Sequence, residues 1–355
     1  MKKTDVIIEM EKLHNLNSGL GQFCLHLGHA MQESLVSKDS TSDFLNVKYF
    51  VPSDKLNVFG ERNSVKKKWH HRYLGVGADC RIWHQAHQSS VYWPKNKSTK
   101  IILTVHDLNF LDKYKGKKRE FHRRFLQKNI DRADVITVIS DHTNGILQGN
   151  VDTGSKKIVR IYNGNSLKKF DAPRKPAFMG DGKFLFSIGI FSAKKNFEVL
   201  LPFIKQLENM NLVIAGNHNT EYGRKIKELI QYHGVARQVI LPGEVSDEER
   251  YWLFRNCSAF VFPSLSEGFG LPVIEAMCLG KPTFLSEYSS LPEVGGTEAF
   301  YFKNFDPVHM ANEFRSRMSE FVFDIAKATR IIQHSEKFTW KKSAQEYLDL
   351  YRSLL

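Results

Sequence analysis

Short apolar runs alternate with longer amphipathic segments along nearly the whole chain of 355 residues, and this alternation limits the fold more than any other feature. The runs IILTV (101–105) and VITVI (135–139) are apolar on both faces, as strands inside a buried parallel sheet are. A strand-then-helix order that repeats in this way is typical of doubly wound sheets covered by helices. The sequence therefore predicts an α/β fold.

Individual strands and helices follow from the same pattern. The predicted strands are Asp5–Met10, Asn46–Val51, Arg81–Trp83, Lys100–Val105, Asp134–Val138, Ile158–Tyr162, Phe184–Ile188, Leu212–Ala215, Val239–Leu241, Ala259–Phe262, Thr283–Leu285 and Ala299–Phe302. The predicted helices include Gly21–Ser34, Lys117–Ala133, Phe197–Glu208, Glu221–His233, Asp247–Asn256, Pro307–His334 and Thr339–Leu355.

A stretch rich in Gly, Pro and charged residues interrupts the alternation between Asn163 and Lys183. Such a composition is typical of an interdomain linker, and a chain of this length has room for two domains. We expect residues 1–165 and 166–340 to form two Rossmann-like domains that face a central cleft. Ligands of such sheets bind where the carboxyl ends of strands lead into helices.

The cysteines favour a reducing compartment, and the short N-terminal apolar run bears on targeting. The four cysteines (Cys24, Cys80, Cys257 and Cys278) form no Cys-x-x-Cys pair, which argues against a zinc site and against a disulfide framework. The first fifteen residues, MKKTDVIIEMEKLHN, hold only a short apolar run and predict neither a signal peptide nor a membrane span. We therefore expect a cytoplasmic protein.

The formal net charge of +13 is unevenly distributed. Residues 1–150 hold 24 Lys and Arg against 15 Asp and Glu, concentrated in the runs Val65–Arg72 and Lys113–Arg124. Such a surface attracts nucleic acid, an anionic membrane or a phosphorylated substrate, although a solvated charged face explains any single run equally well. No aromatic-basic motif of a nucleic-acid-binding module is visible, so nucleic acid is not expected as a partner.

The segment SEGFGLPVIEAMCLGKP (266–282) carries the most specific chemistry. It follows a predicted strand, and Pro272 suits the first turn of a helix that should begin near Leu271. The glycines leave backbone N–H groups free to bind phosphate, although a tight turn alone would also require glycine. Glu267 and Glu275 stand on either side, and a carboxylate that accepts two vicinal hydroxyls is a good ribose ligand. The segment therefore favours a nucleoside-diphosphate ligand.

Two further loops offer groups for anion binding. Gly189 to Asn196 follows a predicted strand and carries Lys194 and Lys195, which would neutralise a diphosphate, although a surface lysine pair is the plainer interpretation. The loop Ser18–Gly21 precedes the first long helix and is a weaker candidate of the same kind.

Histidines stand at two strand ends. His106 ends the strand at 100–105 beside Asp107, where it is either a site residue or a structural cap. His84 and His87 lie three apart at another strand end, a spacing that suits a metal on a helix but not on a strand. We expect no metal site.

Together these motifs resemble the retaining glycosyltransferases of family 4, the glycosyl transferases group 1, which have the GT-B fold. The resemblance rests mainly on PSLSEGFGLPVIEAMCLGKP (263–282), similar to the family's Glu-x7-Glu signature, and on SSLPEVGG (289–296). NSGLGQF (17–23), TVHDL (104–108), SAKKNFEVL (192–200) and the closing FTW (338–340) support it. It implies a C-terminal helix, 341–355, that packs back on the first domain.

The resemblance also implies roles for single residues. His106, Lys195 and Glu267 correspond to catalytic positions, with Glu267 by the transferred sugar and His106 beside the anomeric carbon. The implied nucleotide-sugar-binding positions are Gly19, Gly189, Lys194, Lys195, Gly268, Phe269, Gly270, Leu271, Val273 and Glu275. Many members place an arginine near Gly189 as a second phosphate cation, but Ile190 and Phe191 follow here, so Lys194 substitutes or Lys195 acts alone.

The expected reaction is a retaining, metal-independent transfer of a hexosyl group, with mannosyl favoured, from a GDP- or UDP-sugar and without a cofactor. Glucosyl and N-acetylhexosaminyl transfer remain open. The acceptor is a hydroxyl of a glycan or lipid-linked molecule in surface polysaccharide or lipopolysaccharide synthesis, and peripheral contact with the inner membrane face is a further expectation. The alternatives are a sugar-phosphate or phosphorylase-like GT-B enzyme, and a basic nucleic-acid- or membrane-binding protein without catalysis.

Overall fold

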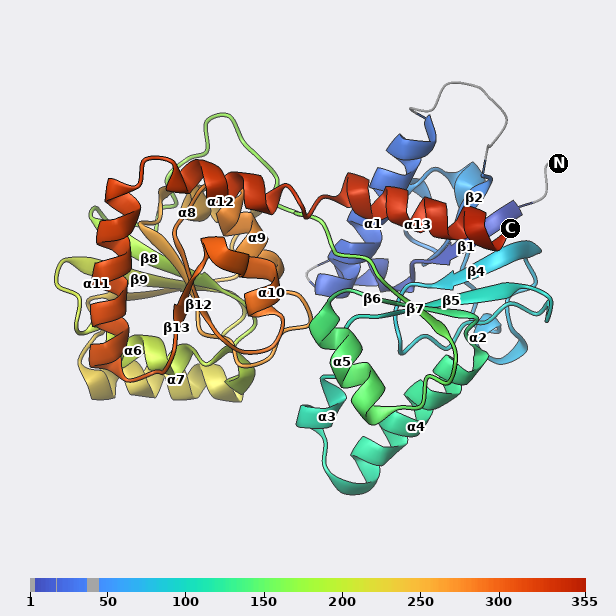
Figure 1. The fold of residues 1–355 in the computed structure, drawn as a ribbon, viewed down its shortest axis with the longest axis horizontal. Coiled ribbons are helices and arrows are strands. Elements are labelled where there is room, and N and C mark those ends of the chain that lie inside the picture. Colours follow the sequence, from blue (N-terminus) through green and yellow to red (C-terminus); the bar gives the residue numbers. More distant parts are fainter. Residues whose placement is uncertain (1–3, 17, 37–44) are drawn as a thin grey trace. The chain divides into compact units, whose positions relative to one another are not determined.

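The computed structural model describes residues 4–16, 18–36 and 45–355 (Figure 1). The first three residues of the N-terminal segment and Asn17 of the NSGLGQF motif lie outside these ranges. The chain divides into two compact units, which are described separately. The first unit contains residues 1–164 together with 338–355, and the second contains residues 165–337.

The first unit is built on a sheet of seven strands in the order β3-β2-β1-β4-β5-β6-β7. Each neighbouring pair is parallel. The sheet extends in both directions from the first strand, as in doubly wound nucleotide-binding folds. Its strands are β1 (Thr4–Glu9), β2 (Val47–Val51), β3 (Ser64–Lys66), β4 (Cys80–Gln85), β5 (Lys100–Val105), β6 (Val135–Val138) and β7 (Lys157–Arg160).

Alternate residues of these strands enter two different cores, because successive side chains of a strand point to opposite faces. Val6, Ile8 and Tyr49 pack with α1 (Gly19–Val36) and α13 (Trp340–Leu354) on one face (Figure 1). On the opposite face, Leu103 and Val105 pack with α4 (Gly116–Arg132) and α5 (Asp141–Asn150). The short helices α2 (His71–Leu74) and α3 (Phe110–Lys113) complete the unit.

The C-terminal helix belongs to the first unit, as the family resemblance predicts. Tyr347 and Tyr351 of α13 are buried in the same core as α1. Their hydroxyls reach the sheet: Tyr351 Oη is 2.7 Å from His84 Nδ1, and Tyr347 Oη is 3.1 Å from Thr104 Oγ1. The end of the chain therefore closes one face of the first sheet.

The second unit repeats the architecture with six parallel strands in the order β10-β9-β8-β11-β12-β13. The strands are β8 (Lys183–Ile188), β9 (Met210–Ala215), β10 (Val239–Gly243), β11 (Ala259–Phe262), β12 (Thr283–Ser286) and β13 (Phe300–Phe302). The helices are α6 (Leu200–Ile204), α7 (Glu221–His233), α8 (Asp247–Asn256), α9 (Leu271–Met277), α10 (Leu291–Gly295), α11 (Pro307–Phe323) and α12 (Lys327–Ser335). The α/β prediction is confirmed for both units.

Three local predictions differ from the structure. The strand β3 (Ser64–Lys66) overlaps the start of the basic run Val65–Arg72 and was not expected there. The predicted helix 307–334 is two helices, α11 and α12, separated at Asp324–Ala326. The predicted helix 197–208 is shorter, because it opens as a 3-10 turn at Phe197–Val199 and continues only as α6. None of the helices in the described ranges combines the length and apolar character that a membrane-spanning segment requires.

Candidate functional site

The Gly-rich segment of the second unit joins β11 to α9, as the sequence predicts. Gly270 caps α9 with a φ of 103°, a left-handed conformation that a residue with a Cβ rarely adopts. Pro272 lies in the first turn, where its missing N–H costs no hydrogen bond. Gly268, Phe269, Leu271 and Val273 therefore lie at the carboxyl edge of the second sheet, where the helix begins.

Lys195 and Glu267 form the central contact of this edge. Lys195 Nζ lies 2.5 Å from Glu267 Oε1, and the two side chains are only 11% and 12% exposed. Lys195 Nζ also lies 4.7 Å from the centre of the Phe262 ring. Burial alone would raise the pKa of Glu267, but the positive charges of Lys195 and Lys194 outweigh it and hold that pKa below its usual value. Glu267 is therefore ionised at neutral pH.

Gly189 provides space for the lysine side chain. It follows β8 with a φ of 156°, and a Cβ built there would come within 2.9 Å of Lys195 Cε. The side chain of Lys195 thus lies directly over the glycine. The next two residues have no positive charge: Ile190 is exposed and Phe191 is buried.

Serine hydroxyls fix the position of Glu267. Ser264 Oγ lies 2.6 Å from Glu267 Oε1 and 3.0 Å from the Lys194 carbonyl oxygen, and its single proton can be donated to only one of them at a time. The Glu267 N–H donates to Ser289 Oγ at 3.0 Å, and Ser290 Oγ donates to the Phe269 carbonyl at 2.9 Å. The loop before α10 thereby holds the Gly-rich turn.

Glu275 lies on α9 and is fully buried. Its Oε2 accepts a hydrogen bond from Arg250 of α8, and its Oε1 has no partner among the described residues. Burial raises the pKa of Glu275, and the neighbouring guanidinium offsets only part of that effect. A buried carboxylate oxygen without a partner is suited to accept a ligand hydroxyl. Arg250 was not predicted from the sequence.

In the first unit, His106 lies directly after β5 and is almost fully buried. Its Nε2 donates to the Ala86 carbonyl at 2.8 Å, which assigns the proton of the neutral ring to Nε2. Burial lowers the pKa of His106, so the ring is neutral at physiological pH. Its backbone N–H donates to Gln88 Oε1 at 3.1 Å, which fixes the strand end.

Gly19 is the first residue of α1, and no atom lies within 4 Å of a Cβ built on it. Ser18 Oγ caps this helix by accepting from the Gly21 N–H at 3.0 Å. One turn further, the Phe23 ring meets the His106 ring edge-on at 4.5 Å. The helix that begins at Gly19 is therefore packed against the candidate histidine.

The other two histidines have different surroundings. His84 is structural, because its ring nitrogens contact Tyr351 Oη and Thr104 Oγ1 at 2.7 Å each. His87 lies near Glu9 and Glu11, with ligand atoms within 4.8 Å of one another. This group could hold a metal, and it was not predicted because the acids lie more than seventy residues from His87 in the chain. Lys67 Nζ, 3.3 Å from Glu11, already supplies a positive charge to the group.

Solved structures with the same architecture are glycosyltransferases of the GT-B fold. Sucrose-phosphate synthase from Thermosynechococcus elongatus superposes with a TM-score of 0.74 at 16% identity, over 99% of both chains. HepE of Anabaena, solved in complex with UDP and glucose, gives 0.65 at 15% identity, over 99% of this chain and 100% of that one. At these identities the similarity shows the fold alone, and the fold is GT-B as predicted.

The family comparison concerns the second unit. Residues 168–337 match the family described as glycosyl transferases group 1. The chain thus has the GT-B fold, and nearly all of its second unit matches the group 1 glycosyltransferases, as its Glu-x7-Glu segment predicts.

Several curated relatives are mannosyltransferases. The serotype-specific mannosyltransferase WbdA of Escherichia coli is 29% identical over 279 residues, which cover 73% of this chain and 34% of that protein. The O-antigen chain mannosyltransferase B of Escherichia coli is 25% identical over 76% of this chain and 74% of its own length. RfbU of Salmonella typhimurium, also an O-antigen chain mannosyltransferase, is 27% identical over 56% and 55%. This chain spans about a third of the length of WbdA.

Proposed function

We propose that this protein transfers a hexosyl group, with mannosyl favoured, from a GDP- or UDP-sugar to a hydroxyl of a glycan or lipid-linked acceptor in surface polysaccharide or lipopolysaccharide synthesis. The family of the second unit and the named activities of its relatives support this class of reaction. The single observation that carries it is the nearly buried Lys195–Glu267 pair at the strand-to-helix edge of the second sheet.

Each part of the donor matches one group at this edge. A diphosphate takes the positive charge of Lys195, with Lys194 and Gly189 beside it, and the backbone N–H of Leu271 at the start of α9, since the Val273 N–H already donates to the Gly270 carbonyl at 2.9 Å. The sugar lies by Glu267 and the turn Gly268–Gly270. The ribose hydroxyls reach the unpartnered Oε1 of Glu275.

The chemistry is a retaining transfer. The bond between the anomeric carbon and the diphosphate oxygen breaks, and its electron pair leaves with the diphosphate, whose growing charge Lys195 stabilises. The acceptor hydroxyl forms its bond to the same face of the anomeric carbon and gives its proton to a diphosphate oxygen. Gly19 contacts the phosphate and the acceptor, and the neutral His106 ring positions the reacting groups rather than supplying a proton.

The reaction requires neither a cofactor nor a metal in this scheme, because Lys195 and backbone N–H groups supply the positive charge that a metal would otherwise bring. Because Glu9, Glu11 and His87 could hold a metal ion, removal of metal from the protein tests whether the transfer needs one. Full transfer activity after dialysis against EDTA supports it, and activity that disappears and returns with a divalent cation overturns it.

The basic first unit also favours peripheral contact with an anionic membrane surface, where a lipid-linked acceptor would be presented. The runs Val65–Arg72 and Lys113–Arg124 supply the charge. Binding to vesicles that weakens with added salt supports this contact, and binding that is indifferent to lipid charge contradicts it.

A donor-hydrolysis panel tests the reaction itself. The purified chain is incubated separately with GDP- and UDP-linked mannose, glucose and N-acetylglucosamine, and release of the nucleoside diphosphate is measured. We expect one donor, GDP-mannose by preference, to be hydrolysed, and Lys195→Ala to abolish that hydrolysis. Release of sugar 1-phosphate from a glycan and inorganic phosphate, with no nucleoside diphosphate released from any of the six donors, would identify a phosphorylase-like enzyme and reject the proposal.

A further inference from the structure

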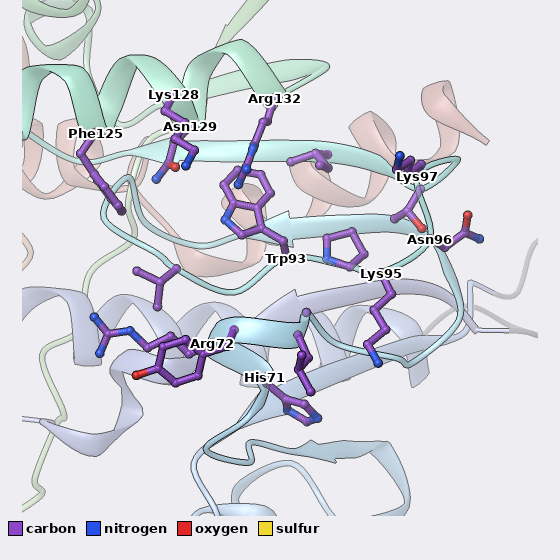
Figure 2. Close-up of a pocket in the computed structure, with 17 residues that line it drawn as sticks. His71, Arg72, Trp93, Lys95, Asn96, Lys97, Phe125, Lys128, Asn129 and Arg132 are labelled. Atoms are coloured by element: carbon purple, nitrogen blue, oxygen red, sulfur yellow. The ribbon is translucent and has the colours of Figure 1, made fainter.

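A pocket of about 710 Å³ lies in the first unit, away from the residues assigned to transfer (Figure 2). It is formed by α2 with Gly75, by the segment 91–99, by Ile101 of β5 and by the C-terminal half of α4. Figure 2 shows Arg132 and Lys128 on α4 above Trp93, with Lys95 and Lys97 on the segment that leads to β5.

The lining of this pocket is strongly positive. Its charged residues are Arg72, Lys95, Lys97, Lys128 and Arg132, and His71 lies beside them. No Asp or Glu is present among its described lining residues, and the ion pairs described for the chain involve none of the five cations. Five uncompensated positive charges around one cavity attract a multiply charged anion.

The inner surface is fixed by packing and hydrogen bonds. Asn129 is 1% exposed and its Nδ2 donates to the carbonyls of Gln88 and Ser90 at 2.9 and 3.2 Å. The Arg132 guanidinium lies 4.6 Å from the centre of the Trp93 ring, which holds that cation over the cavity. The pocket is therefore a preformed feature rather than a set of independent surface side chains.

The location separates this pocket from the acceptor side of the transfer reaction. Thr99 and Ile101 line it at the amino end of β5, whereas His106 follows the carboxyl end of the same strand. A strand rises about 3.3 Å per residue, so Ile101 and His106 are separated by roughly 16 Å along it. A ligand in this pocket would not contact His106.

Exposed apolar side chains lie on and just before α2, at one side of this pocket. Tyr73 and Leu74 line the pocket and are 74% and 63% exposed, and Trp69, two residues before α2, is 82% exposed. Aromatic and apolar side chains beside Lys and Arg form the combination that enters the headgroup layer of a membrane. A soluble phosphate would require the cations but not these exposed side chains.

We propose that this pocket binds the phosphate of an anionic phospholipid headgroup, with Trp69, Tyr73 and Leu74 inserted in the interfacial layer around it. The proposal rests on the membrane contact proposed above and gives it a specific site. It does not depend on the identity of the sugar donor.

Vesicle cosedimentation of the full chain tests the site. The vesicles are phosphatidylglycerol mixed with phosphatidylcholine, and phosphatidylcholine alone is the reference. The pocket variant is Lys128→Gln with Arg132→Gln. The matched variant is Lys117→Gln with Lys118→Gln, which removes the same charge from the first turn of the same helix but outside the pocket. Equal thermal unfolding of the two variants shows that both are folded.

A specific headgroup site predicts that the pocket variant loses at least about tenfold more vesicle affinity than the matched variant, whereas charge alone predicts equal losses. Equal losses would overturn the pocket and leave the general membrane contact standing. If the wild-type chain does not bind phosphatidylglycerol vesicles, both the pocket site and the general membrane contact are overturned. The proposed sugar transfer is not affected by that result, because the assay contains no sugar donor.

Soluble glycerol 3-phosphate shows whether the pocket prefers a lipid headgroup or a free phosphate compound. Its binding is followed by tryptophan fluorescence, with Trp93→Phe identifying the signal from the pocket. We expect glycerol 3-phosphate to compete weakly with vesicles for the wild-type chain. The pocket variant should no longer show this competition. Glycerol 3-phosphate binding as tight as vesicle binding would overturn the lipid assignment, since the exposed side chains would then contribute nothing.

Discussion

Lys195 Nζ lies 2.5 Å from Glu267 Oε1 although the two residues are 72 positions apart in the chain. Both side chains are nearly buried, so the attraction is weakly screened and the geometry is restricted. The carboxylate keeps the ammonium at the carboxyl edge of the second sheet, and the ammonium keeps the carboxylate ionised. In the proposed reaction the cation stabilises the diphosphate and the carboxylate contacts the sugar.

Replacement of the acid should reduce turnover. We expect Glu267→Gln to lower kcat/KM by roughly 10- to 100-fold, the loss of one hydrogen bond to a charged group. The matched control is Glu198→Gln, because Glu198 pairs with Lys225 in the same way but at an exposed position. An unchanged kcat/KM for Glu267→Gln would show that the carboxylate has no role at the sugar.

The ribose assignment of Glu275 predicts a selective loss. Glu275→Gln should weaken binding of the nucleoside diphosphate by about 1–3 kcal/mol, because the neutral amide is a poorer acceptor for two hydroxyls. The same substitution should change binding of the corresponding 2′,3′-dideoxynucleoside diphosphate little, because that ligand lacks both ribose hydroxyls. Calorimetry with both ligands measures the difference. Equal losses for both would mean that Glu275 acts through its contact with Arg250 and not through the ribose.

Stability should depend on pH through Glu9. Burial raises the pKa of Glu9 to about 7, whereas in the unfolded chain it titrates near 4.5. The folded state then holds the proton more tightly, so the contribution of Glu9 to the free energy of unfolding falls as the pH rises from about 4.5 to about 7, by at most about 3 kcal/mol. The lowered pKa of neighbouring His87 acts in the opposite direction at acidic pH.

The contribution of Glu9 can be isolated by comparing variants. Relative to wild type, Glu9→Gln should gain stability as the pH rises through this window, measured by urea unfolding at pH 5 and pH 8. Glu33→Gln, on the exposed side of α1, should follow wild type. A constant difference between Glu9→Gln and wild type at the two pH values would contradict the raised pKa.

The C-terminal helix should stabilise the first unit through its buried hydroxyls. Tyr351→Phe removes the partner of His84 Nδ1 inside the core, which should cost about 1–3 kcal/mol in the free energy of unfolding. Tyr232→Phe, on an exposed side chain of α7, provides the control and should have no effect. An equal, negligible change in both variants would show that the Tyr351–His84 contact contributes nothing.

The fold could be predicted largely because both sheets are parallel and buried, so that their strands are continuous apolar runs. The exception is β3 (Ser64–Lys66), which overlaps the start of the charged run Val65–Arg72. It is the first strand in the sheet order and pairs with β2, and an edge strand needs no apolar pattern on both faces. The break between α11 and α12 was also missed, because apolar spacing continues across Asp324–Ala326.

The candidate site could be predicted only for those residues that lie close together in the sequence. The Gly-rich turn, the start of α9 and the position of Lys195 follow from local spacing. Ser264 was missed although it lies only three residues before Glu267, because the path of an irregular loop decides which group its hydroxyl meets. Arg250 was missed as a partner of Glu275, since a contact across 25 residues depends on how α8 packs beside α9. The cluster of Glu9 and His87 was missed for the same reason: β1 and β4 are neighbours in the sheet but not in the chain.

Nucleotide binding to Lys195→Ala tests the central claim most directly. Calorimetry of the wild-type chain and this variant compares the nucleoside diphosphate with the matching monophosphate, for both guanosine and uridine. We predict that wild type binds one of the diphosphates and that Lys195→Ala weakens this binding by at least about tenfold, with little change for the monophosphate, because the lysine acts on the diphosphate. Failure of wild type to bind either diphosphate, or equal losses for diphosphate and monophosphate, would contradict the donor site described for the second unit.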